Sequence, residues 1–462
     1  MTEVAVRSPQ WWLDQLFKRL TTRNVGTRAL EEYYDGRPKL KFVTKKYEEG
    51  FGAMLRGVSD NWMALVVDAA EERLHIDGFR VGDESAGDKP AWEIWQRNSL
   101  DADSELLHRD ALVTGRGYAM VWYGTDGAEI TVEEPTDVIV AYQAGSRRTR
   151  EAALKAWTDE WTGRVYANVY LPDAIWKFEA PAPGEGVGVE SVRWTPRAGD
   201  EMVANPLKVV PIVEFRNRPR TNGSARSEIE DVLSVQDQIN KLVCDMLVAS
   251  EFAAYPQRYA AGIEPDVDPD TGEEKPPFKA AIDRVWTTGD PETKFGQFAA
   301  ADLGNYVKAI ENRVQSLASR TRTPPHYLLG QSGSFPSGES LKATETGLVA
   351  KVRSKARHFG ESWEEVMRLA GDVEEKDGLS AAIGAEVIWR DPESRTEAEH
   401  IDALGKLRVM LNVPLEQLWA DAGYTPQQIG RFRSMLLDEA LLRIAATPTE
   451  PAVPGPEPDG TP

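Results

Sequence analysis

The chain has 462 residues, of which 41% are hydrophobic and 28% are charged, and its formal net charge is −20. This length exceeds that of one compact core, so we expect at least two structural regions, and the composition excludes a largely disordered chain. A strongly acidic surface also argues against tight DNA binding, because DNA affinity comes from Lys and Arg side chains that displace counterions.

The sequence contains a single cysteine, Cys244, which excludes an intrachain disulfide and fits a reducing compartment. The opening segment MTEVAVRSPQWWLDQLF lacks a basic stretch followed by an apolar run, so we expect no signal peptide. No stretch reaches the roughly 18 to 20 apolar residues that a membrane-spanning helix needs. The sequence therefore predicts no association with a membrane.

The first half of the chain predicts helices and then a β-rich region. Apolar residues recur at helical spacing over residues 9–34 and again over residues 60–75. The segments YAMVWYG and AEITVEE flank Asp126 and Gly127, a pattern typical of a β-hairpin. Several further short strands separated by Gly, Pro and charged residues make residues 78–218 a β-rich region of α+β character.

Three long helices are predicted in the second half. Residues 224–253 keep the helical spacing without Gly or Pro, which predicts a rod of about 45 Å. A loop-rich insert at 254–301 separates this helix from a second amphipathic helix over 303–320, which Pro324 and the proline after it terminate. A Gly/Ser-rich loop then precedes the third helix, over 338–370.

The C-terminal part predicts a strand, a helical cluster and a tail. The segment AEVIWRD reads as a strand that returns to the β-rich region. Residues 396–446 predict about three helices, one of which begins with Thr425 as its cap and Pro426 in its first turn. The last sixteen residues, TPTEPAVPGPEPDGTP, are proline-rich and predict a disordered tail.

Enzyme signatures are absent from the sequence. There is no GxxxxGK[ST] phosphate loop, GQSGS lacks the last glycine of GxSxG, and the five histidines form no HExxH motif. Asp266, Asp268 and Asp270 alternate as calcium ligands do, but Thr271 and Pro277 stand where an EF-hand loop needs Gly and Glu. We therefore expect a solvated acidic turn, no metal, no cofactor and no enzyme activity.

Basic residues gather at two places, and a solvated surface is the ordinary interpretation of each. The first group is in the β-rich region, and the second, which follows the Gly/Ser-rich loop, is the more notable in so acidic a chain. The groups comprise Arg147, Arg148 and Arg150, and then Lys351, Arg353, Lys355, Arg357 and His358.

Five segments resemble portal proteins of tailed phages, most closely those of long-tailed phages that infect actinobacteria. They are DNWMALVVDAAEERLHIDGFR, RDALVTGRGYAMVWYG, SEIEDVLSVQDQINKLVCDMLVASEFAAYPQRYAAG, ASRTRTPPHYLLG and FPSGESLKATETGLVAKV. None is a catalytic signature. The resemblance lies in long strings in the same order over about residues 30–370.

The resemblance implies an α+β portal fold with a β-rich wing, a stem of long helices, a clip and a helical crown, assembled as a ring of twelve subunits. On this plan the chain divides into N-terminal helices 1–49, wing 50–223, first stem helix 224–253, clip 254–301, second stem helix 302–330, tunnel loop and long helix 331–371, return strand 372–395, crown 396–446 and tail 447–462. A rod as long as 224–253 buries its apolar stripe best against neighbours in such a ring, since a head-to-tail interface closes when the rotation is right.

The resemblance also implies partners and a location. The ring would stand at the portal vertex of the capsid in the virion, after assembly in the host cytoplasm. Double-stranded DNA would pass through it without sequence specificity. Its protein partners would be the large terminase subunit, head–tail connector (adaptor) proteins, and the major capsid and scaffolding proteins.

Two sets of residues are candidate sites under this resemblance. A mostly acidic channel repels phosphate and lets DNA slide, so few DNA contacts are expected. We assign them to the tunnel loop and its flank, at Gln331, Ser332, Ser334, Phe335, Ser337 and Lys342. The acidic turn of the clip would bind partner proteins through Asp266, Asp268, Asp270, Glu273 and Glu274.

Two other classes of protein remain as alternatives. A nuclease would need clustered carboxylates that hold Mg²⁺, and the three aspartates between 266 and 270 are its only candidates. A cytoplasmic scaffold would use the long helices as a coiled coil, but the spacing follows 3.6 residues and keeps no sustained heptad seam.

Overall fold

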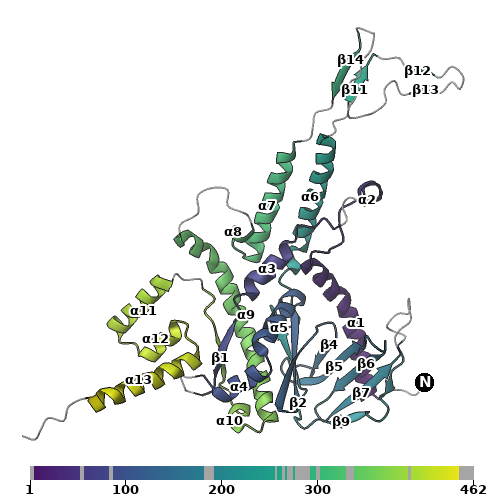
Figure 1. Ribbon diagram of the computed structural model, residues 1–462. Coiled ribbons are helices and arrows are strands. Elements are labelled where there is room, and N and C mark those ends of the chain that lie inside the picture. The colour runs from purple at the N-terminus through teal and green to yellow at the C-terminus, as the bar shows by residue number, and fades with distance from the viewer. Residues whose placement is uncertain are drawn as a thin grey trace, which may run out of the picture.

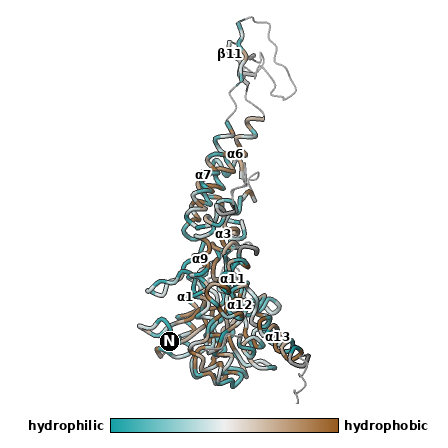
Figure 2. Tube along the Cα trace, turned by 90° about the vertical axis from the view of Figure 1, so that its left-hand side faces the viewer, coloured by the Kyte–Doolittle hydropathy of each residue, from teal (hydrophilic) through white to brown (hydrophobic). Residues whose placement is uncertain are grey.

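The computed structural model describes residues 5–52, 57–82, 87–181, 192–254, 258–262, 266–267, 274–275, 292–297, 302–328, 338–393 and 397–446. Figure 1 shows a broad body of helices and sheets, a helical hairpin that projects from it, and a separate C-terminal group of helices. Turned by 90°, the molecule is much narrower (Figure 2), so the subunit has the form of a blade with two broad faces.

Five helices precede the first large sheet. They are α1 (Pro9–Tyr34), α2 (Lys45–Phe51), α3 (Trp62–Glu71), α4 (Lys89–Arg97) and α5 (Leu100–Thr114). Ser8 caps α1 by accepting a hydrogen bond from the backbone N–H of Trp11 at 3.2 Å, and Asn61 caps α3 in the same way. Helix α5 ends at Gly115, whose φ of +89° suits glycine, and a Cβ there would lie 3.0 Å from the backbone of Arg226.

The body contains two antiparallel sheets and one isolated strand pair. In the three-stranded sheet β2 is central, and β2 and β3 form the hairpin predicted at Asp126 and Gly127. Its strands are β2 (Arg116–Gly124), β3 (Gly127–Glu133) and β10 (Ile212–Arg216). The six-stranded sheet comprises β4 (Val138–Tyr142), β5 (Arg150–Thr158), β6 (Val165–Tyr170), β7 (Ala174–Ala180), β8 (Thr195–Pro196) and β9 (Met202–Ala204).

The main core lies between the three-stranded sheet and the helices α3, α4, α5 and α9 (Gly338–Val373). The indole N–H of Trp363 on α9 donates to Nε2 of His108 on α5 at 2.9 Å, and the His108 ring stacks on Phe359. Burial lowers the pKa of His108 to about 3, so the ring is neutral and accepts this bond at physiological pH. A second core forms where Leu13, Leu16 and Leu20 of α1 cover the six-stranded sheet.

The projecting hairpin consists of α6 (Leu233–Ala254) and α7 (Leu303–Thr321), which lie side by side (Figure 1). The predicted start of the first helix at residue 224 is wrong, because Glu228 is held in the body, where its backbone N–H donates to the carbonyl of Leu112 at 2.8 Å. A 3-10 turn over Glu230–Val232 precedes α6, whose 22 residues span about 33 Å.

Short strand pairs occupy the far end of the hairpin (Figure 1), where the sequence predicted only a loop-rich insert. Strand β11 (Arg258–Ala261) pairs with β14 (Lys294–Gln297). Strand β12 (Asp266–Val267) pairs with β13 (Glu274–Lys275).

Helix α9 connects the base of the hairpin to the body. It is 36 residues long, which confirms the predicted third helix, and Leu348, Val352, Phe359 and Trp363 along one side are all buried. Beyond the short α8 (Pro325–Leu328) and α10 (Asp377–Ser380), strand β15 (Glu386–Trp389) returns to the body as predicted and pairs antiparallel with β1 (Ile76–Arg80).

The C-terminal group comprises the three helices that the sequence predicted: α11 (Glu397–Leu411), α12 (Leu415–Asp421) and α13 (Pro426–Ala446). Thr425 is the predicted cap, since its hydroxyl accepts from the N–H of Gln428 at 3.3 Å, while the Gln428 side chain accepts from the Thr425 N–H at 2.9 Å. Among the described helices none is both long and apolar enough to cross a membrane.

Candidate functional site

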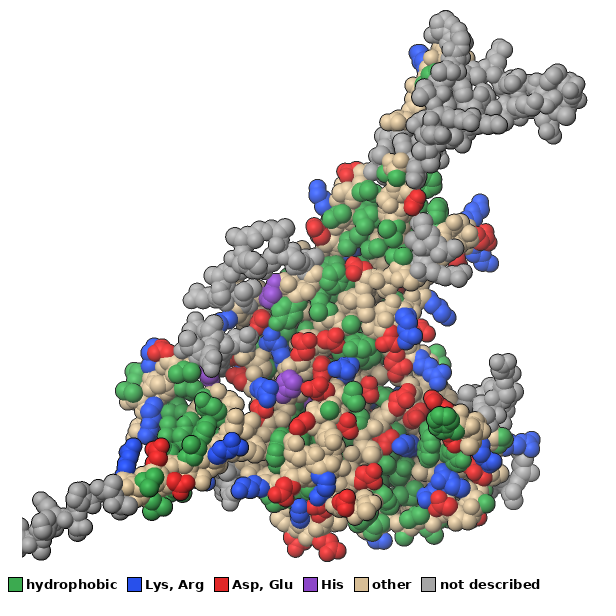
Figure 3. Space-filling view, in the orientation of Figure 1, with side chains coloured by type: hydrophobic (Ala, Val, Ile, Leu, Met, Phe, Trp, Pro, Cys, Tyr) green, Lys and Arg blue, Asp and Glu red, His purple; other side chains and the backbone are tan. Residues whose placement is uncertain are grey.

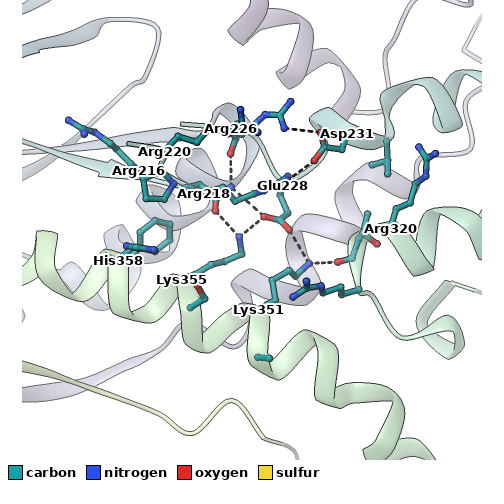
Figure 4. A pocket seen from close by; sticks show the side chains of 18 residues that line it. Arg216, Arg218, Arg220, Arg226, Glu228, Asp231, Arg320, Lys351, Lys355 and His358 are labelled. Atoms are coloured by element: carbon teal, nitrogen blue, oxygen red, sulfur yellow. Dashed lines mark hydrogen bonds and ion pairs between the residues drawn. The ribbon is translucent and has the colours of Figure 1, made fainter. Parts of the chain in front are cut away.

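A basic cleft of about 520 Å³ lies where the hairpin joins the body (Figure 4). Its walls come from the loop after β10, the C-terminal end of α7 and the middle of α9. Two acidic residues, Glu228 and Asp231, stand among a larger set of cations. The cations are Arg216, Arg218, Arg220, Arg226, Arg320, Arg322, Lys351 and Lys355.

Glu228 is at the centre of the cleft and joins four segments of the chain. Its carboxylate accepts from Nζ of Lys355 and lies 3.3 Å from Nζ of Lys351, both on α9. Lys355 also donates to the side-chain carbonyl of Asn217 at 2.7 Å, and Lys351 donates to the carbonyl of Thr321, at the end of α7, at 2.8 Å. The end of α7, the loop after β10 and α9 are therefore linked through Glu228 and the two lysines that it binds.

Around Glu228, one buried carboxylate faces two buried ammonium groups, those of Lys351 and Lys355. Burial alone would raise the pKa of Glu228, but Lys355 and Lys351 outweigh that effect and lower it to about 2. Burial lowers the pKa of Lys355 to about 8 and also lowers that of Lys351, while Glu228 opposes both shifts. One carboxylate thus neutralises one of two buried ammonium groups, and an excess positive charge remains in the cleft.

Several arginines on the rim add to this excess. Arg218 pairs with Asp231 at 2.6 Å, and Arg226 lies 3.3 Å from the same carboxylate. Arg220, Arg320 and Arg322 are exposed and have no ion pair within the described part of the chain. The cleft is thus a concentrated positive region in a chain whose formal net charge is −20.

The interpretation of the α9 basic group as one solvated face is wrong for two of its members. Lys351 and Lys355 point inward, whereas Arg353 points outward and pairs with Asp391 at 3.1 Å. The sequence carried a signal for this, because Lys355 lies at helical spacing between the buried Val352 and Phe359. A lysine inside an apolar stripe needs a buried acid, and that acid is Glu228, which sequence reasoning missed.

The other basic group is divided in a similar way. Arg150 is largely buried, pairs with Glu365 of α9 at 2.5 Å and donates through Nε to the carbonyl of Val210 at 3.0 Å. Arg147 and Arg148 are exposed, as expected of a solvated turn. Arg150 therefore anchors the six-stranded sheet to α9.

The predicted tunnel-loop and clip residues are only partly covered by the structure. Lys342 lies near the start of α9, but Gln331, Ser332, Ser334, Phe335 and Ser337 lie outside the described residues. In the clip, Asp266 pairs in register with Lys275, and Glu274 with Val267, whereas Asp268, Asp270 and Glu273 lie outside the described residues. Both candidate sites stay predictions.

Candidate metal ligands do not cluster in the part of the chain that the structure describes. Within it no three His, Cys, Asp or Glu side chains come together in a way that would hold a metal ion. Cys244 is buried, and burial raises the pKa of its thiol above the ordinary range.

The described residues form an α+β body, a projecting helical hairpin with strands at its tip, a long helix at its base and a C-terminal helical group (Figure 1). Residues 19–428 match the family model described as phage portal protein, SPP1 Gp6-like. The chain therefore belongs to this family, as its resemblance to phage portal proteins predicted.

Two relatives support this assignment over nearly the whole chain. The portal protein of Mycobacterium phage D29 is 29% identical, over 96% of this chain and 92% of the relative. The portal protein of Mycobacterium phage L5 is 30% identical, over 86% of this chain and 84% of the relative. Both infect actinobacteria, the group of hosts that the resemblance indicated.

Replacing Glu228 by Gln should lower the free energy of unfolding by about 3 to 5 kcal/mol, because two buried ammonium groups lose their counter-charge. Urea unfolding at fixed protein concentration measures this. E439Q is the matched control, since Glu439 forms only an exposed pair with Arg443 on α13 and its loss should change stability by less than about 1 kcal/mol.

The effect should also depend on pH. The folded-state pKa of Glu228, about 2, lies below its ordinary value of 4.5, so its contribution is complete above pH 4.5 and is lost as the pH falls towards 2. The stability difference between wild type and E228Q should therefore shrink over that interval. Equal unfolding midpoints for E228Q and E439Q at pH 7 would show that the joint does not stabilise the fold.

Proposed function

We propose that this chain forms the ring-shaped portal at one vertex of a phage capsid, through which double-stranded DNA is packaged and later ejected. The observation that carries the proposal is the match to the portal family over residues 19–428. The blade-like shape supports it, because flat subunits with two broad faces pack side by side around an axis (Figures 1 and 2).

Exposed apolar side chains on the hairpin give a physical reason for a ring. Phe252 on α6 is 51% exposed and Val307 on α7 is 46% exposed. The packing of α6 against α7 therefore leaves apolar side chains of both helices in contact with solvent. The C-terminal helices also expose apolar side chains, such as Val409 and Leu442. Neighbouring subunits would bury both sets, which favours a closed assembly over an isolated chain.

We assign the parts of the portal as follows. The wing is the body with its sheets, the stem is α6 and α7, the clip is the strand pairs beyond them, and the crown is α11, α12 and α13. The proposed ring has twelve subunits. The major capsid and scaffolding proteins would surround the ring at its vertex in the virion.

The proposed DNA contacts lie in the tunnel loop, residues 331–337, and at Lys342. In the sequence, residues 331–337 come between α8 and α9, and Lys342 lies near the start of α9. In so acidic a protein, a few polar contacts guide DNA without holding it, since phosphate contacts carry no sequence information.

Replacing residues 331–337 by seven residues of unrelated sequence should reduce the amount of packaged DNA severalfold while leaving ring assembly intact. Nuclease-protected DNA per capsid measures packaging, and the mass of the purified ring measures assembly. An exchange of the five residues 159–163, in the turn between β5 and β6, for unrelated sequence is the control. Unchanged packaging would contradict the assignment of DNA contacts to this loop.

The clip is the proposed docking site for the large terminase subunit, which supplies the packaging ATPase, and later for connector proteins. Its acidic residues, Asp266, Asp268, Asp270, Glu273 and Glu274, would attract basic partner surfaces and speed their association.

Neutralising these five residues to Asn and Gln should weaken terminase binding, with a stronger effect at low salt because the attraction is electrostatic. Binding of purified terminase to immobilised rings measures this. A control neutralises five exposed acids outside the clip. Equal affinity of the two variants would remove the acidic turn from the docking surface.

A further inference from the structure

The basic cleft between the stem and α9 contains more positive charge than its own carboxylates neutralise. Lys351 and Lys355 share the carboxylate of Glu228. Three arginines at the rim are exposed and form no ion pair with the described residues: Arg220, Arg320 and Arg322. On the face of the body that Figure 3 shows, by contrast, Lys and Arg side chains are interspersed with Asp and Glu. Because a cleft lined by charge of one sign attracts counter-ions, this one offers a site for an anion from outside the subunit.

Two arginines of this cleft have a backbone conformation that arginine rarely adopts. The φ angles of Arg218 and Arg322 are +48° and +56°, in the left-handed region where the Cβ of an ordinary residue crowds the backbone. Arg322 is also the C-cap of α7, and helices commonly end with a glycine in this conformation. The chain thus places an arginine side chain at the cleft in spite of an unfavourable backbone. Residues held in this way cluster at ligand-binding sites.

The end of α7 accounts for only part of this positive charge. The free carbonyl groups at the C-terminus of a helix are equivalent to about half of a negative elementary charge, which attracts cations. Lys351 already donates to the carbonyl of Thr321 at 2.8 Å, and the N–H groups of Arg322 and Thr323 both donate to that of Ala318. A helix end satisfied in this way does not need three further arginines.

The cations surround one space from several sides. Figure 4 shows Lys351 and Lys355 pointing from α9 toward Glu228, with Arg220 and Arg320 on either side of that carboxylate. The cleft has a volume of about 520 Å³, which is within the range of small-ligand sites. Lys355 is only 5% exposed and is held by Glu228, so its positive charge has a fixed position when a ligand enters.

Phosphate is the anion that this set of side chains fits best. A guanidinium group presents its N–H donors in a plane that matches two phosphate oxygens. A carboxylate has a single negative charge, whereas a phosphate monoester has about −1.5 to −2 at pH 7 and a DNA strand repeats its charge at every nucleotide. Because several cations of the cleft lack a partner, phosphate neutralises them better than one carboxylate does.

We propose that the basic cleft binds phosphate groups through Arg220, Arg320 and Arg322, above a fixed positive floor formed by Lys351 and Lys355. One subunit supplies all of these residues, so binding does not depend on the ring. Free inorganic phosphate and the backbone of duplex DNA both supply this chemistry. The DNA source rests on the proposed function and would add a DNA contact outside the tunnel loop.

The test measures the affinity of the full-length protein for inorganic phosphate, by calorimetry, and for a short DNA duplex, by fluorescence anisotropy. Ionic strength is held constant, because salt screens both interactions. R220Q/R322G loses two direct ligands, so its affinity for at least one probe should fall about tenfold or more. The variant should stay folded in urea unfolding, since glycine suits the left-handed backbone at position 322.

R19Q/K208G is the matched control. Lys208 is exposed and left-handed like Arg322, with a φ of +57°, and Arg19 is exposed on α1, so the charge lost is the same. Neither residue lines the cleft. This variant should therefore bind both probes within about twofold of wild type.

The two probes separate the sources of the phosphate. Weaker binding of the duplex by folded R220Q/R322G would assign the cleft to the DNA backbone, and weaker binding of inorganic phosphate alone would assign it to the free anion. Affinities equal to those of R19Q/K208G for both probes would overturn the inference, and a loss of rings in that case would make the cleft a contact between subunits. If wild type forms no ring but R220Q/R322G loses phosphate binding, the proposed ring fails and this inference stands.

Discussion

The carboxylate of Glu228 lies between the ammonium groups of Lys351 and Lys355, and three parts of the subunit meet at that point. Glu228 belongs to the segment that leaves the body for α6, the lysines belong to α9, and Lys351 also reaches the end of α7. The segment that leads into α6 and the end of α7 are thus joined to α9 through the buried side chains of Glu228, Lys351 and Lys355. Such a joint has a defined geometry, since each buried charge needs its partner in place.

Helix α9 also contacts the other parts of the body. Trp363 binds His108 of α5, Glu365 pairs with Arg150 of the six-stranded sheet, and Lys355 holds Asn217 after β10. The helix therefore fixes both sheets relative to the stem.

Local sequence patterns predicted most helices and the β2–β3 hairpin, because periodicity, the caps Asn61 and Thr425, and the Asp126–Gly127 turn are encoded by neighbouring residues. The start of α6 was not predictable in this way, since Glu228 is kept out of the helix by partners more than 100 residues away. The pairing of β1 with β15 has the same long-range origin. For the site, Lys355 was interpreted as part of a solvated surface although its position in an apolar stripe is a signal of burial, and only the fold identifies its partner, Glu228.

Assembly into a ring is tested most directly by a cryo-electron microscopy reconstruction of the purified full-length protein. We expect a closed ring of about a dozen subunits, with α6 and α7 around a central hole wide enough for a B-form duplex. Monomers or dimers that persist whatever the protein concentration and salt would contradict it, because the apolar side chains exposed on the stem and on the C-terminal helices would then have no partner surface.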